Sequence, residues 1–103
     1  MDELNDAQRA WMTVSDTPDD GELLVGLGGE LDIAGLPDVE PQVAALLERA
    51  PQPLRLDLRE LRFLDSSGVA VLVRLANHFH PVATVEATPG VRRVVQVLGL
   101  ADR

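Results

Sequence analysis

A short segment in the middle of the chain contains residue types that can do chemistry at a helix boundary. The segment Phe63–Leu75 (FLDSSGVAVLVRL) joins one apolar run to another through Asp65, Ser66, Ser67 and Gly68. A serine or aspartate placed before a helix accepts hydrogen bonds from the unpaired N–H groups of its first turn, which contributes about 1 kcal/mol. The simplest interpretation is therefore a helix cap, which Asp65, Ser66 or Ser67 could each provide.

A second interpretation is a hydrolase nucleophile, which needs a serine, a histidine base and an orienting acid. The elbow pattern G-x-S-x-G is absent, because Leu64 stands two residues before Ser66 where the pattern needs glycine, although Gly68 stands two residues after it. His78 and His80 lie about three helical turns beyond the serines. The same two histidines are only a weak indication of a metal site, because the chain has no cysteine to complete a set of ligands. We expect no catalytic residue, no metal site and no cofactor.

A third interpretation is a serine that a partner enzyme modifies. The first turn of a helix presents unpaired N–H groups and a partial positive charge, so a phosphate placed there gains hydrogen bonds. The phosphate would also add nearly two negative charges beside Asp65 and Asp32, changing both the shape and the charge of the local surface. A partner docked on that surface would be strongly affected. The residues alone leave the cap and the modified serine open.

Turn residues and apolar periodicity divide the chain into alternating strands and helices. A flexible lead-in is expected over Met1–Ala10, followed by the domain over residues 11–103. The expected strands are Trp11–Val14 and Leu23–Leu27, forming a hairpin through a turn at residues 15–21, then Leu54–Leu58 and Val82–Val85. The expected helices are Pro37–Arg49, Gly68–Phe79 and a last one capped at Thr88 and stopped at Gly99. The order β-β-α-β-α-β-α predicts a single α/β domain with a mixed, mostly parallel sheet.

The second predicted helix offers a candidate docking face next to Ser66. Its apolar stripe indicates which residues face inward, namely Val69, Leu72, Val73, Ala76 and Phe79. The opposite side then carries Ala70, Val71, Arg74, Asn77 and His78. With Ile33 and Gly68 nearby, these residues predict a partner-binding patch, although isolated exposed valines are common. Arg92 and Arg93 on the last helix are a second candidate contact, although such charges are more often simply solvated.

Composition narrows the function classes. The 103-residue chain is 46% apolar and carries a formal charge of −8, which disfavours binding to nucleic acid. No apolar run reaches the roughly 20 residues that span a bilayer, so no direct membrane insertion is expected. The acidic start MDELNDAQRA lacks the basic and apolar regions of a secretory signal. A cytoplasmic location is the expectation.

Three segments resemble a known family when they are taken in order. They are GGELD, then LRLDLRELRFLDSSGVAVLVRL, then TPGVRRVVQVLGL, and together they cover about Leu23 to Leu100. This pattern is similar to the anti-sigma factor antagonists, whose domains are shared with sulfate transporter tails and are called STAS domains. The resemblance implies a sheet of four to five strands with about three helices on one main side, and no catalysis.

The resemblance also implies a function and site residues. The first serine of D-S-S-G, here Ser66, matches the phosphate acceptor, and Ser67 matches a helix cap or minor acceptor. Asp32 and Asp65 match the acidic neighbours of the acceptor. A GHKL-type serine/threonine kinase that is also the anti-sigma factor is expected to bind the unmodified protein and to be released after it phosphorylates Ser66. A serine/threonine phosphatase is expected to restore binding.

Two departures from the family pattern favour an alternative. The link NHFHPV is short, where many relatives carry a Gly-rich basic loop, and the chain stops at Arg103, where many stand-alone antagonists continue. The stop at Arg103 is similar to that of compact STAS subunits of lipid-transport ATPase complexes. A non-switching subunit of such a complex, or of a large sensory assembly, is therefore the alternative expectation.

Overall fold

The computed structural model describes residues 8–17 and 21–99, without the side chain of Val85. The predicted turn residues 18–20 and most of the predicted lead-in lie outside the described residues. The last part of the lead-in is not separate from the domain, because Ala10 is buried and begins the first strand.

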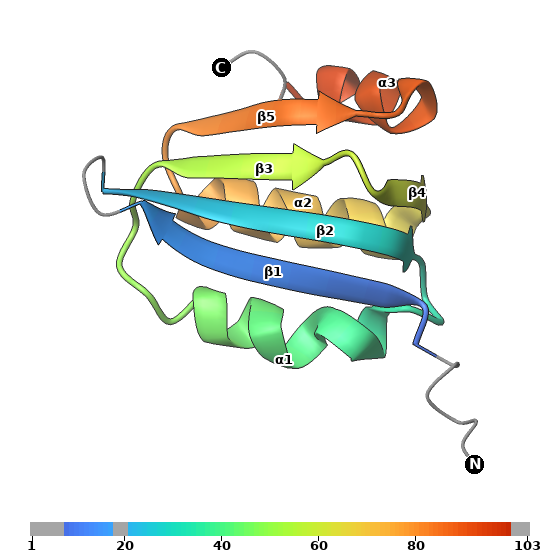
Figure 1. Ribbon diagram of the computed structural model, residues 1–103, viewed down its shortest axis with the longest axis horizontal. Coiled ribbons are helices and arrows are strands. Elements are labelled where there is room, and N and C mark those ends of the chain that lie inside the picture. Colours follow the sequence, from blue (N-terminus) through green and yellow to red (C-terminus); the bar gives the residue numbers. More distant parts are fainter. Residues whose placement is uncertain (1–7, 18–20, 100–103) are drawn as a thin grey trace.

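Five strands and three helices follow one another along the chain (Figure 1). The strands are β1 (Ala10–Thr17), β2 (Glu22–Leu31), β3 (Leu54–Leu58), β4 (Leu61–Leu64) and β5 (Val82–Ala87). The helices are α1 (Leu36–Leu46), α2 (Ser66–His78) and α3 (Pro89–Val97). The predicted α/β class is confirmed. The predicted order of elements is also found, with one addition: β4 is a strand that the sequence patterns did not predict.

The strands form one mixed sheet in the order β1-β2-β3-β5, and β4 also pairs with β2. The β1–β2 hairpin is antiparallel, whereas β2–β3, β2–β4 and β3–β5 are parallel. Strand β2 therefore pairs first with β3, through Leu23 to Gly26, and then with β4, through Gly29 to Leu31. The predicted mostly parallel sheet with an antiparallel edge is confirmed.

The change of partner along β2 explains why this strand is longer than predicted. The strand expected over Leu23–Leu27 continues to Leu31, with an irregularity between Gly29 and Glu30. Gly29 has φ +83°, and a Cβ there would come within 2.1 Å of the carbonyl oxygen of Arg9. Glycine at this position thus lets the backbone bend towards β4 while still forming pairs.

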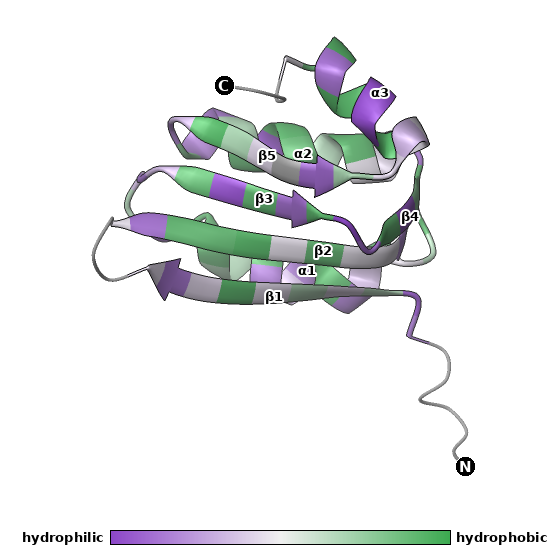
Figure 2. Cartoon of the chain, turned by 45° about the horizontal axis from the view of Figure 1, so that its top comes forward, coloured by the Kyte–Doolittle hydropathy of each residue, from purple (hydrophilic) through white to green (hydrophobic). Residues whose placement is uncertain are grey.

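The core is aliphatic and lies between the sheet and two helices. Figure 1 shows α2 behind the sheet and α1 alongside β1, and in Figure 2 both helices lie behind the strands, while α3 lies beyond β5. Within the described residues, every fully buried side chain is apolar, from Leu23 and Val25 on β2 to Phe79 after α2. This burial fixes which face of each helix can reach a partner.

The inward face of α2 differs from the prediction. Val71, predicted to face outward, is fully buried together with Leu72 and Leu75, whereas Val73, predicted inward, is 36% exposed. Figure 2 shows that α2 is apolar along most of its length, so periodicity alone did not identify the buried side. Gly68 settles the rotation, because a Cβ there would come within 2.2 Å of the Leu31 carbonyl oxygen.

Candidate functional site

The serine motif lies at the carboxyl edge of the sheet, where two parallel strands end together. Leu31 at the end of β2 pairs with Leu64 at the end of β4. The loops that follow these strands therefore lie side by side, and they carry Asp32 and Asp65. The carboxyl edge of a parallel sheet is where α/β proteins commonly place their functional residues.

Asp65 caps α2. Its Oδ1 accepts hydrogen bonds from the backbone N–H groups of Ser67, at 2.8 Å, and Gly68, at 3.2 Å. Its Oδ2 accepts from the N–H of Ile33, at 3.1 Å, in the loop after β2. One carboxylate thus organises the helix start and ties it to the neighbouring loop. The expectation that Ser67 caps the helix is wrong, because Ser67 donates its own N–H to Asp65.

Ser66 is the first residue of α2, and it is exposed. Two of the first-turn N–H groups that a phosphate could have bound, those of Ser67 and Gly68, are already occupied by Asp65. A group attached to the Ser66 hydroxyl would therefore meet the Asp65 carboxylate more than unpaired helix donors. The chemical consequence of modifying Ser66 is added negative charge beside an existing one.

Asp32 begins the loop after β2 and belongs to a separate hydrogen-bond network. Its Oδ1 accepts from the Gly35 N–H at 2.7 Å, and its Oδ2 accepts from Nη2 of Arg9 at 3.1 Å. The Arg9 hydrogen bond, followed by the Gly35 N–H, holds the pKa of Asp32 below its usual value. Arg9 also pairs with Glu30 at 3.0 Å. Asp32 is therefore ionised and shapes the loop that carries Ile33.

Comparison with known proteins identifies the family. The family model described as "Mlab, STAS domain" matches residues 14–102. The chain belongs to the STAS domain family. Among curated proteins, it is 29% identical over 84 residues to the putative anti-sigma factor antagonist BtrV of Bordetella bronchiseptica, covering 78% of this chain and 72% of that one.

Solved structures agree with this assignment. An anti-sigma factor antagonist from Mycobacterium paratuberculosis is 27% identical, with a TM-score of 0.72, over 90% of this chain and 80% of that one. SpoIIAA in its unphosphorylated form is 18% identical, with a TM-score of 0.59, over 84% of this chain and 82% of that one. The phosphorylated form of the Bacillus protein SpoIIAA has a TM-score of 0.58 at 19% identity, over 87% of this chain and 85% of that one. The last two likenesses establish the fold of this STAS domain, which is the fold of SpoIIAA.

The predicted partner-binding residues of this STAS domain separate into three groups. Ile33 is 75% exposed, and Ala70 is exposed one turn beyond Ser66. Gly68 and Val71 are buried, so the prediction that they lie on a docking face is corrected by the rotation of α2. Arg74 and His78, the third group, are held by contacts with α1 and the residues after it.

These contacts tie α2 to α1 and place both residues away from Ser66. Arg74 forms two hydrogen bonds with the Glu40 carboxylate, at 3.3 and 3.1 Å. The ring Nε2 of His78 lies 2.6 Å from the carbonyl oxygen of Arg49, and the ring packs edge-on against Phe79. His78 is about 18 Å along the helix from Ser66, since an α-helix rises about 1.5 Å per residue. Both residues join the two helices.

The sequence patterns did not identify one exposed residue near Ser66. Phe63 on β4 is 51% exposed, although large aromatic side chains are usually buried. The available signal was the aromatic side chain two residues before the cap, in a chain with 3% aromatic residues.

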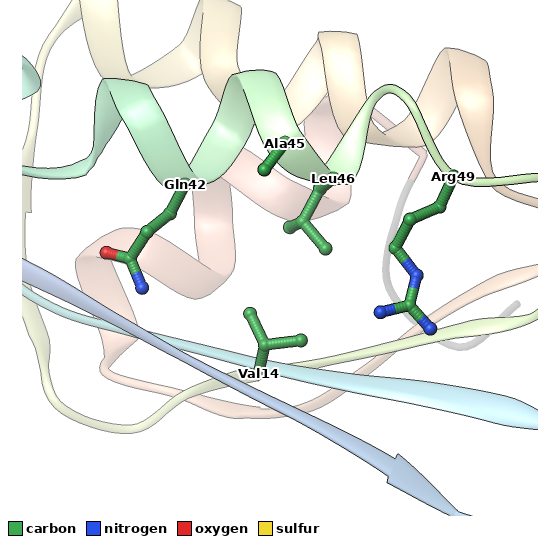
Figure 3. Close-up of a pocket in the computed structure, with 5 residues that line it drawn as sticks. All are labelled: Val14, Gln42, Ala45, Leu46 and Arg49. Atoms are coloured by element: carbon green, nitrogen blue, oxygen red, sulfur yellow. The ribbon is translucent and has the colours of Figure 1, made fainter.

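Another hollow of this STAS domain lies away from the serine motif. A cavity of about 310 Å³ opens between β1 and α1 and is lined by Val14, Gln42, Ala45, Leu46 and Arg49 (Figure 3). Because Arg49 also contacts His78, this hollow lies towards the end of α2 that is opposite Ser66. The described residues contain no group of three metal-ligating side chains, and none of their helices has the length and hydropathy to cross a bilayer.

Proposed function

We propose that this STAS domain is a cytoplasmic anti-sigma factor antagonist controlled by phosphorylation of Ser66. The unmodified protein binds a GHKL-type anti-sigma factor that is also a serine/threonine kinase. That kinase phosphorylates Ser66 and is then released, and a serine/threonine phosphatase regenerates the binding form. The likeness to proteins described as anti-sigma factor antagonists supports this assignment.

One observation carries the proposal. Ser66 presents an exposed hydroxyl directly after Asp65, whose carboxylate is fixed by three backbone N–H groups. A phosphate on that hydroxyl adds nearly two negative charges beside a carboxylate that cannot easily turn away. The resulting repulsion and desolvation at a contact surface weaken binding of a partner.

The proposal is tested by incubating the protein with ATP and candidate GHKL-type kinases of the same genome. We expect mass spectrometry to find phosphate on Ser66 and Ser66→Asp to bind the kinase at least about tenfold more weakly than the wild type, or about 1.4 kcal/mol. Ser67→Ala is the matched control and should still take up phosphate. Normal uptake by Ser66→Ala would show that the acceptor is wrongly assigned.

A second candidate is a non-switching STAS subunit of a lipid-transport ATPase complex or a large sensory assembly. The matching family model is described as "Mlab, STAS domain" and not as an anti-sigma factor antagonist, which keeps this candidate open. Co-purification distinguishes the two. A membrane ATPase that binds the wild type and Ser66→Asp equally would favour the second candidate, whereas a kinase that binds only the wild type would favour the first.

A further inference from the structure

An apolar groove lies beside the serine motif, between β4 and the first turns of α3. It has a volume of about 210 Å³ and is lined by Arg62, Phe63, Leu64, Gly90, Val91 and Val94. We call it the β4–α3 groove. Leu64 is two residues before Ser66, so the groove and the serine adjoin along the chain.

Helix α3 extends the apolar surface beyond the groove. Val97 is 82% exposed and lies one turn after Val94, on the side of the helix that also carries Gly90. Phe63, which is 51% exposed, is on the β4 side of the groove. Single exposed apolar residues are normal, but these residues adjoin one concave surface, which is typical of a protein-docking site.

One arginine lines the groove and another follows on the exposed side of α3, and the charges of both are largely available. Arg62 lines it and lies 3.8 Å from Glu30, whereas Arg93 follows Gly90 by three residues and precedes Val97 by four. Within the described part of the chain, Arg93 and its neighbour Arg92 make no ion pair. The other described arginines pair with carboxylates at 3.3 Å or less; these are Arg9, Arg49, Arg55, Arg59 and Arg74.

We propose that the β4–α3 groove docks a segment of the anti-sigma factor that combines apolar side chains with carboxylates. This rests on the proposed function for the identity of the partner. The apolar side chains occupy the groove beside Phe63 and Val97, and the carboxylates lie against Arg62 and Arg93. Such charge complementarity sets orientation and association rate.

A protein partner fits this surface better than an anionic membrane. The chain carries a formal charge of −8, so an anionic lipid surface repels most of the molecule. Two arginines contribute only about 1 kcal/mol each at such a surface. A segment that contacts the groove alone experiences the local positive charge without approaching the acidic remainder.

The chain offers a matched pair of variants for the test. Arg92 and Arg93 are neighbours, both exposed and both without an ion pair in the described region, but Arg93 lies nearer to Gly90, and so to the groove, around α3. Arg93→Glu and Arg92→Glu therefore change the net charge equally. Binding of a kinase that passes the phosphorylation test is measured by calorimetry at low and high salt. We expect Arg93→Glu and Val97→Asp to weaken binding at least tenfold, and Arg92→Glu to stay within twofold.

Equal effects of Arg92→Glu and Arg93→Glu would overturn the groove assignment while leaving the phosphorylation switch intact. If no kinase binds the wild type, the proposed function fails and a peptide pair decides about the groove alone. An acetylated and amidated Glu-Leu-Leu-Glu peptide should shift the amide resonances of Gly90, Val94 and Val97, whereas Lys-Leu-Leu-Lys should not. Absence of those shifts, or binding of phosphatidylserine vesicles that is lost in Arg93→Glu, would also overturn the proposal.

Discussion

At the scale of single residues, Asp65 stabilises the start of α2 through its side chain, and the two serines beside it do not. Its two oxygens accept three backbone N–H groups, two in the first turn of α2 and one in the loop after β2. The serine hydroxyls are therefore not needed to start the helix. This division of roles lets Ser66 change chemically without removing the cap.

Replacing Asp65 tests this division. Asp65→Ala should lower the free energy of unfolding by about 1 to 2 kcal/mol, because the cap is lost. Asp65→Asn keeps one oxygen for the first-turn N–H groups but cannot accept from Ile33 with its –NH₂, so it should cost less. Urea denaturation measures both, and amide hydrogen exchange at Ile33 should be faster in both variants. An unchanged urea midpoint in Asp65→Ala would contradict the capping role.

At the scale of elements, α2 connects the serine motif to both the sheet and α1. Gly68 brings the helix against the Leu31 carbonyl at one end, and His78 contacts the Arg49 carbonyl at the other. The Arg74–Glu40 pair between them is about 40% exposed on each side, so it contributes at most about 1 kcal/mol. Burial of the apolar face, more than this ion pair, holds the helix in place.

Two valines on α2 test the observed rotation of the helix. Val71→Ala should lower the free energy of unfolding by about 1.5 to 3 kcal/mol, because two buried methyl groups are lost and a cavity remains. Val73→Ala removes the same atoms from an exposed position and should change it by less than about 0.5 kcal/mol. Urea midpoints of the two variants measure the difference. A larger destabilisation by Val73→Ala than by Val71→Ala would instead support the inward face of α2 that periodicity predicted.

At the scale of the whole molecule, acidic residues dominate the charge, and two of them are held ionised by arginines. Hydrogen bonds from Arg9 and Arg59 hold the pKa values of Asp32 and Asp57 below their usual value of 3.8. A carboxyl with a lowered pKa in the folded state stabilises that state above its unfolded pKa, and this contribution is lost as the pH falls through the folded value. At pH values above those at which the two aspartates are protonated, lowering the pH towards the isoelectric point near 4.5 reduces the repulsion between the negative charges of the chain.

These opposing effects predict the acid behaviour of the protein. We expect the urea midpoint to change little between pH 7 and 5 and to fall steeply between pH 4 and 3. Arg9→Gln and Arg59→Gln should each raise the pKa of the partner aspartate and make the fall below pH 4 less steep. Urea midpoints at four pH values measure this. If the midpoint of the Arg9→Gln/Arg59→Gln double variant fell as steeply as that of the wild type, the role of the two pairs would be contradicted.

The sequence by itself determined the order of elements apart from β4, the mostly parallel sheet and the location of Ser66 at the start of α2. These features depend on local turn chemistry, apolar periodicity and a motif of adjacent residues. Only the tertiary structure decided which face of α2 is buried, because an apolar helix has no unique stripe and Gly68 against Leu31 sets its rotation. Tertiary structure also revealed β4 and the β4–α3 groove, since four residues of strand carry little periodicity and a groove exists only where β4 and α3, distant in sequence, pack together.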